Sequence, residues 1–206
     1  MKLIDNKFYG YLEIFANYFL LNILWVLACL PIITFFPATS AMYSVIRCWK
    51  LKDDTGVFVL FIKYFKENFK QSFSIGIIWF VITIILYVDF LFMRQSEFSS
   101  FLFIPLLIIG LLFAFTSIYV FPIISHYNIS TKTIIKSSFF ISMTYFPMTI
   151  LNLILLALIA AALYYYPITS LILFSFAAFV NFSICHIVFT KNSKLHEQSA
   201  LQQTTE

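Results

Sequence analysis

Charged residues are scarce in this chain, and so are glycine and cysteine. Of its 206 residues only 11% are charged, four are glycine and three are cysteine, whereas 62% are hydrophobic. An average soluble domain is about 25% charged and about 45–50% apolar, so this composition excludes an ordinary water-soluble fold. Four glycines cannot supply a Gly-rich phosphate-binding loop, and three widely separated cysteines do not suit a disulfide framework or a zinc site.

Catalytic motifs are missing as well. The chain has no Gly-x-Ser-x-Gly and no His-Glu-x-x-His, and no two of its three histidines have the spacing of metal ligands. We therefore expect no enzyme activity, no cofactor and no bound metal. The net charge of +4 comes from basic residues at the edges of apolar runs and not from one continuous patch. The expected partner is thus a lipid bilayer and not nucleic acid.

What the chain has in abundance is long apolar runs. Five of them approach the ~17–25 residues that a transmembrane helix needs, and they lack the strict alternation of a barrel strand. The fold class predicted is therefore all-α, a polytopic membrane helical bundle. We expect one integral membrane domain over residues 1–190 and a polar, disordered, cytoplasmic tail over 191–206. The runs are 15–36, 73–92, 101–124, 149–166 and 169–189.

The segment 57–70, just before the second run, has two opposed faces. Lysines and a glutamate recur at helical spacing on one face, and phenylalanines recur on the other. This pattern predicts an amphipathic helix lying in the headgroup layer. The same pattern also suits a polar extension of the second membrane helix that packs on protein.

Pro31 and Pro37 interrupt the end of the first run, because proline removes a backbone donor and breaks a membrane helix. We expect five full spans, with a broken or re-entrant segment after Pro37. A short helix over residues 38–49 that recrosses the membrane is the alternative, although ~12 residues at 1.5 Å each reach only ~18 Å of a ~30 Å hydrocarbon core.

Basic residues in the connections set the orientation, because Lys and Arg are enriched in cytoplasmic loops. Ten of them fall in connections that alternate along the chain, which predicts a cytoplasmic C-terminus. Five crossings would leave the N-terminus outside, and six would bring it inside. The ten are Arg47, Lys50, Lys52, Lys63, Lys66, Lys70, Lys132, Lys136, Lys191 and Lys194.

A few polar residues lie inside the apolar runs. Asp89 is the acid within the second run, and an ionisable group there is a functional candidate, although it lies near the helix end and could simply reach headgroups, water or Arg94. Four uncharged polar residues are candidates for a substrate path, but interhelical hydrogen bonds explain them without any substrate and are the favoured explanation. They are Asn22, Asn152, Asn181 and His186.

Four motifs in the first 95 residues resemble the signature of the YesL family of bacterial integral membrane proteins. They are PIITFFPATSAMY (31–43), VIR (45–47), FKENFKQ (65–71) and YVDF (87–90). The candidate functional or signature residues are Pro31, Thr34, Pro37, Ala38, Ala41, Arg47, Asn68, Phe69 and Asp89. The resemblance implies a multi-pass protein of a bacterial, Gram-positive cell membrane.

The family has no assigned activity, so the resemblance supplies no catalytic residue. Its members are often encoded beside carbohydrate-uptake and polysaccharide-degradation systems, which implies a part in sugar import or its regulation. Two hypotheses follow. The protein is an accessory or scaffold component that contacts subunits of a sugar-transport complex, or it is a small transporter or channel. A transporter requires Asp89, Asn152, Asn181 or His186 to converge on a water-accessible path.

Overall fold

Every regular element in the described part of the chain is helical. The computed structural model describes residues 2–52, 56–95 and 99–203. The predicted all-α bundle is confirmed, and five of its helices are long and apolar enough to cross a membrane. The elements are α1 (Lys2–Cys29), η1 (Ile32–Thr34), α2 (Phe35–Lys52), α3 (Val57–Gln95), α4 (Ser99–His126), α5 (Thr131–Thr144), α6 (Phe146–Tyr165), η2 (Pro167–Thr169) and α7 (Ser170–Gln203).

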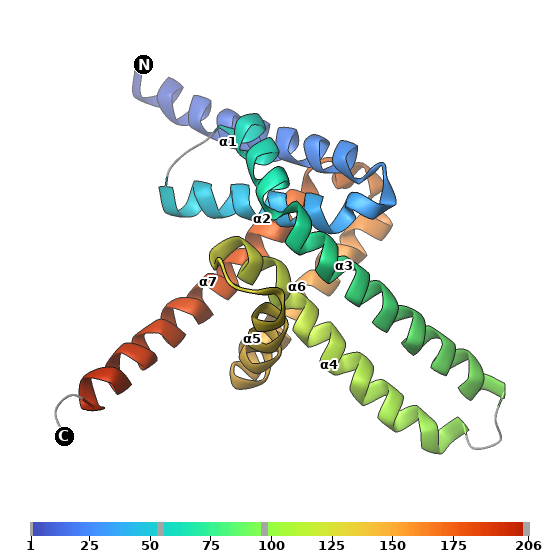
Figure 1. Cartoon of the computed structure of the whole chain (residues 1–206). Helices are drawn as coiled ribbons and strands as arrows, with labels where there is room; N and C mark the ends of the chain where they lie inside the picture. The colour runs from blue at the N-terminus through green and yellow to red at the C-terminus, as the bar shows by residue number, and fades with distance from the viewer. Residues whose placement is uncertain (1, 53–55, 96–98, 204–206) are drawn as a thin grey trace.

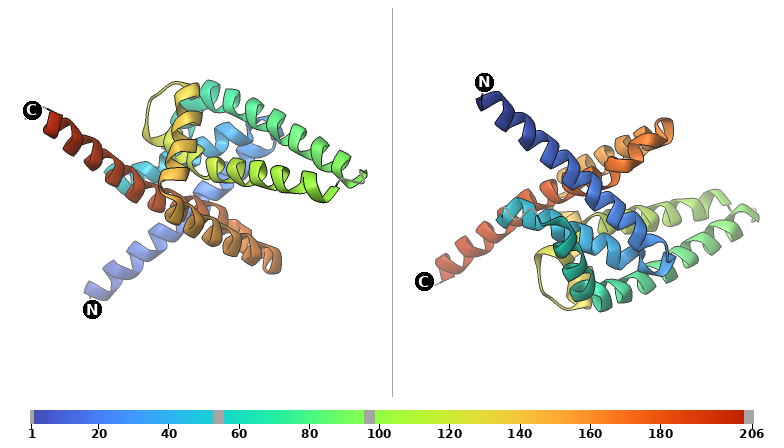
Figure 2. Two further views of the ribbon diagram at one scale, coloured as in Figure 1. Left: turned by 90° about the horizontal axis from the view of Figure 1, so that it is seen from below. Right: turned by 90° about the horizontal axis from the view of Figure 1, so that it is seen from above.

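The helix α2 packs inside the bundle and is not among the five helices that are long and apolar enough to cross a membrane. The chain turns after α1 and runs back antiparallel to it, as Figure 1 shows and both views of Figure 2 repeat. Its 18 residues extend ~27 Å, but the 12 residues before Arg47 that carry no charge extend only ~18 Å of a ~30 Å hydrocarbon core. The two chain ends therefore lie on one side of the molecule, and the α3–α4 and α6–α7 hairpins point to the other.

The break in the chain lies before Pro37 and not after it. The backbone leaves α1 at Cys29 and resumes a regular helix at Phe35, so Pro37 lies within the first turn of α2. A proline is tolerated there because the first N–H groups of a helix have no intrahelical acceptor. The five expected spans agree with the five candidate helices, and a recrossing of the membrane by α2 stays a prediction.

The segment 57–70 is not a separate interfacial helix. It forms the first part of α3, a single helix of 39 residues that continues through the second apolar run. Phe61 and Val57 are buried against α2 in a shared core cluster, whereas Phe58 and Val59 are exposed. The extension packed on protein is therefore the correct alternative, because no glycine or proline interrupts the chain between Val57 and Ser74.

The core is centred on α2. All residues from Pro37 to Ile46 are buried, and this stretch packs between α1, α3 and α7. A second cluster joins the middle of α3 to α4, α5 and α7, with Tyr119 and Phe189 at its centre. Most other large apolar side chains on α1, α3, α4 and α6 face outward, as expected of helices that contact lipid.

The backbone from residue 191 onward continues α7 as a helix as far as Gln203. This end of α7 projects away from the bundle (Figure 1). The division into a membrane domain and a tail stays a prediction.

Candidate functional site

The turn between α1 and α2 is held by Thr34. Pro31 is exposed at the turn, and the Thr34 hydroxyl lies 2.5 Å from the carbonyl oxygen of Ala28 and 2.6 Å from that of Pro31. The Thr34 backbone N–H also donates to Pro31 O at 2.9 Å. Carbonyls at the end of a membrane helix need such donors because lipid offers none. The Pro-x-x-Thr part of the signature therefore closes α1.

Small residues at the start of α2 allow it to approach its neighbours closely. Ala38 and Ala41 have no exposed surface at all. On α3, Gly76 lies directly against the side chain of Phe36. A Cβ added to this glycine would lie only 2.9 Å from Cγ of the Phe36 ring. Close contact of this kind is the usual role of small residues between membrane helices.

Two further signature residues, Arg47 and Asn68, line one polar pocket. The pocket has a volume of about 370 Å³ and lies where α2, α3 and the end of α4 meet. Arg47 Nη1 donates to the carbonyl oxygen of Ser125 at 3.0 Å, which ties α2 to α4. Asn68 Nδ2 donates to Ser44 Oγ at 3.0 Å, and the Ser44 hydroxyl in turn donates to Ser40 O at 2.9 Å.

The remaining walls carry polar groups from α3 and from the link after α4. Gln71 Nε2 donates to the carbonyl oxygen of Ile129 at 2.5 Å, and Tyr64 OH lies 2.9 Å from Cys48 Sγ. Glu67 is exposed and also lines the pocket. Burial raises the pKa of the Tyr127 phenol.

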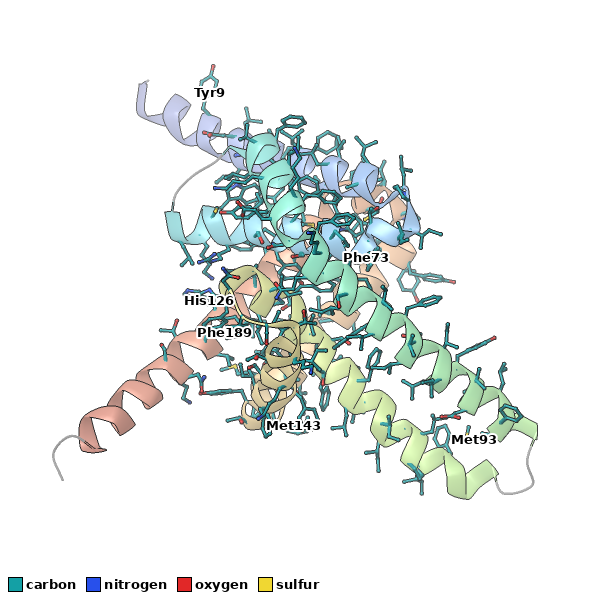
Figure 3. The ribbon with its side chains drawn as sticks, viewed as in Figure 1. Tyr9, Phe73, Met93, His126, Met143 and Phe189 are labelled. Carbon is teal, nitrogen blue, oxygen red and sulfur yellow. The ribbon has the colours of Figure 1, made fainter. Side chains whose placement is uncertain are left out.

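His126 lies at the same junction. Figure 3 shows it beside Phe189, where α4 and α7 meet, and the two ring centroids are 5.3 Å apart. Its ring is also 5.9 Å from that of His186, a residue 60 positions further along the chain. Spacing along the chain does not group these histidines, because only the tertiary fold brings them together.

Part of this site could have been found from the sequence. Tyr64, Asn68 and Gln71 fall at i, i+4 and i+7, which places three polar side chains on one face of a helix. Ser125, His126 and the other residues of the third wall carry no comparable signal.

Phe69 and Asp89, the last two signature residues, do not reach the pocket. Phe69 belongs to a ladder of rings along α3, with centroids 5.6 Å from Phe65 and 6.0 Å from Phe73. Asp89 is exposed near the far end of α3, towards the tip marked by Met93 in Figure 3. The side chain of Arg94, its suggested partner, lies outside the described part of the chain.

The intramembrane asparagines of α6 and α7 bond to each other. Asn152 Nδ2 donates to Asn181 Oδ1 at 3.3 Å, and Asn181 Nδ2 donates to the carbonyl oxygen of Ile118 at 3.4 Å. That carbonyl is free because Pro122, four residues later in α4, has no N–H. Asn181 therefore supplies the donor that the proline removes.

Asn22 forms its hydrogen bond at a different helix contact, between α1 and α7. Its Nδ2 donates to the carbonyl oxygen of Ser170 at 2.5 Å, which joins α1 to the start of α7. Asn22, Asn152 and Asn181 are each at most 4% exposed. The structure thus does not bring Asn22, Asn152, Asn181, His186 and Asp89 to one point.

In the described ranges, no three His, Cys, Asp or Glu side chains gather closely enough to hold a metal ion. The three cysteines are free thiols.

Comparison with known proteins agrees with the resemblance. The family model described as "Protein of unknown function, DUF624" matches residues 18–90. YteU of Bacillus subtilis (strain 168) is 30% identical over 151 residues, which cover 71% of this chain and 68% of YteU. YesL of the same organism is 35% identical over 126 residues, 59% of this chain and 60% of YesL. The chain belongs to the YesL-like DUF624 family.

A third relative of this DUF624 protein, YesV of Bacillus subtilis (strain 168), is 31% identical over 124 residues, 57% of this chain and 60% of YesV. The chain thus spans about 60% of the length of YesL and of YesV. No solved structure matches it significantly. The DUF624 match covers the turn, α2 and most of α3, so it includes two of the three walls of the polar pocket.

Proposed function

We propose that this protein is a non-catalytic accessory subunit of a membrane complex, and that the complex serves carbohydrate uptake in a bacterial cell membrane. The carbohydrate part is supported by the family resemblance. The accessory part is supported by the arrangement of polar groups inside the bundle.

One observation carries the accessory role. A transporter of this size needs polar groups that line a common path, whereas each buried asparagine here donates its amide nitrogen to a neighbouring helix, although the Oδ1 atoms of Asn22 and Asn152 accept no hydrogen bond. Asn152 and Asn181 bond to each other, and Asn22 bonds to the backbone of α7. Hydrogen bonds of this kind hold membrane helices together without any substrate. The interior therefore suits a structural component better than a conduit.

The basic residues suggest the side on which the protein meets its partners. Lys63, Lys66 and Lys70 are exposed on the first half of α3, and Lys132 and Lys136 are exposed on α5. These segments lie at the end of the bundle that also carries the two chain ends (Figure 2). We place this end in the cytoplasm by the enrichment of Lys and Arg there, which puts both termini inside.

A site-specific crosslinking experiment tests the proposal. A photo-crosslinking amino acid is placed at Lys63, on the basic end of α3, and the protein is isolated from its own cells in mild detergent. The matched control carries the same amino acid at Phe92, which is 71% exposed at the opposite end of the same helix. Crosslinks from position 63 to membrane subunits of a sugar-uptake system, without the same products from position 92, are expected.

Solute flux separates the accessory role from the alternative. Purified protein alone in liposomes is expected to give no uptake of sugars beyond that of empty liposomes. Saturable uptake by the protein alone would overturn the accessory role and favour a small transporter or channel.

A further inference from the structure

The polar pocket has two walls of opposite chemical character. On α2, Arg47 is the cation among the pocket-lining residues, and on α3, Glu67 is the acid. The two do not pair with each other: Arg47 is held by Ser125 through Nη1, and Glu67 stays exposed. The pocket therefore presents one positive and one negative group, neither of which is neutralised by the other.

The α3 wall is rich in hydrogen-bond acceptors. Asn68 must donate its amide nitrogen to Ser44 Oγ, because the Ser44 hydroxyl already donates to Ser40 O. Gln71 must likewise donate to Ile129 O, because a carbonyl can only accept. These two bonds fix both amides, and the side-chain carbonyl oxygens of Asn68 and Gln71 remain available beside the Glu67 carboxylate.

The α2 wall offers the opposite groups. A guanidinium has five N–H donors and no acceptor, and Arg47 uses Nη1 on Ser125. Its Nε is buried without a partner in the described structure, so the group is not saturated by protein contacts. Guanidinium groups bind carboxylate and phosphate oxygens through paired hydrogen bonds.

We propose that this pocket binds a small zwitterion, with its oxyanion against Arg47 and its ammonium against Glu67, Asn68 and Gln71. A simple anion would face the Glu67 carboxylate, and a simple cation would face the Arg47 guanidinium, so a ligand that carries both charges suits both walls. A volume of about 370 Å³ is at the lower end of the range for ligand pockets, which fits a small molecule or a headgroup.

This chemistry occurs both in free zwitterions and in the phosphoethanolamine headgroup of a lipid. The inference goes beyond the accessory role and does not depend on it.

Isothermal titration of the full-length protein in maltoside micelles tests the ligand class. The probes are phosphoethanolamine, inorganic phosphate and ethanolamine, the last two each carrying only one of the charges. Phosphoethanolamine is expected to bind at least roughly tenfold more tightly than either single-charge probe, the minimum loss when a charge-assisted hydrogen bond is missing. Equal binding of all three, or no binding of phosphoethanolamine and of the lipid below, overturns the proposal.

A second arm identifies the source of the ligand. Short-chain phosphatidylethanolamine is titrated beside phosphatidylglycerol with the same chains. Preference for phosphatidylethanolamine over free phosphoethanolamine assigns the site to a lipid headgroup, and the reverse preference assigns it to a free zwitterion. Equal affinity for phosphatidylethanolamine and phosphatidylglycerol, together with no binding of phosphoethanolamine, counts against the zwitterion.

Two variants place the ligand in this pocket. Glu67→Gln leaves the fold intact because Glu67 is exposed, and it is expected to lower the affinity for phosphoethanolamine by roughly tenfold to a hundredfold while leaving phosphate binding unchanged or stronger. The matched control Glu13→Gln removes an exposed acid on α1, outside the pocket, and should change nothing. An unchanged affinity in Glu67→Gln refutes the site.

Arg47→Gln removes the opposite charge, with Lys66→Gln as the control for an exposed cation outside the pocket. Arg47→Gln is expected to abolish the preference for phosphoethanolamine over ethanolamine. Because Arg47 also holds α4, its thermal unfolding is recorded in parallel, and Glu67→Gln decides the question if Arg47→Gln does not fold.

Discussion

The fit of Phe36 against Gly76 gives a prediction of defined size. A Cβ at position 76 would lie 2.9, 3.0 and 3.2 Å from Cγ, Cδ2 and Cβ of Phe36. Carbon atoms prefer ~3.5–4.0 Å, so Phe36 would have to move by more than half an ångström. Its ring is enclosed by those of Phe35 at 5.8 Å and Phe121 at 5.5 Å, and the contact with its own Cβ engages the backbone of α2.

Overpacking of this kind costs ~1–3 kcal/mol, whereas the change from glycine to alanine within a helix favours the folded state by ~1 kcal/mol. Gly110 provides the control, because an added Cβ meets nothing within 4 Å there. The difference in the free energy of unfolding between Gly76→Ala and Gly110→Ala therefore isolates the steric term. We expect Gly76→Ala to be the less stable by ~1–3 kcal/mol.

The assay is equilibrium unfolding in mixed micelles of increasing SDS content, followed by far-ultraviolet circular dichroism. A difference below ~0.5 kcal/mol, within the range of a neutral surface substitution, would refute the packing of α2 on α3 described above. The double variant with Phe36→Ala should relieve the strain, so that adding Gly76→Ala to Phe36→Ala costs less than adding it to the native protein.

Three further outcomes are expected. Thr34→Val should lower stability by ~0.5–1.5 kcal/mol, because the turn loses its hydroxyl donor, and Thr34→Ser should restore it; equal stability of the Val and Ser variants would contradict this role. Asn152→Leu and Asn181→Leu should each cost ~0.6–2 kcal/mol in SDS unfolding, with a double variant less destabilised than the sum because the two residues share a bond; strict additivity would argue against that bond. Tyr9→Cys and Tyr165→Cys, at positions 69% and 74% exposed, should react with an impermeant maleimide from opposite sides of the membrane; labelling of both from one side would exclude the even number of passes.

The apolar runs predicted the helix content well, because every long run must satisfy its backbone within lipid and a helix does so. The turn was harder to locate. The sequence placed the helix break at Pro37, yet a proline in the first turn of a helix is compatible with that helix. The regular helix is instead interrupted around Pro31, where the Thr34 hydroxyl donates to a carbonyl at the end of α1. Hydropathy does not mark α2 as a span, because its serines and basic end lower its apolar character, and in the structure neighbouring helices bury it.

The candidate site was predicted in part. Arg47 and Asn68 were identified by the family signature, and the structure places both in one pocket. Asp89 was identified in the same way but lies at the other end of α3. The pocket wall formed by Ser125 and His126 could not be predicted from the sequence, because the spacing of residues along a chain does not show which helix ends meet in space. Asn181 shows the same limit, because its role depends on the carbonyl that Pro122 leaves free in another helix.

The length of α3 has a consequence for where the pocket lies. The helix carries Glu67 and Gln71 on the pocket wall and Asp89 near the opposite end. Its 39 residues correspond to ~58 Å of helix, about twice the ~30 Å of a hydrocarbon core. Figure 2 shows that α3 bends between its first part and the part that runs beside α4. One helix thus supplies both a span and the polar wall beyond it.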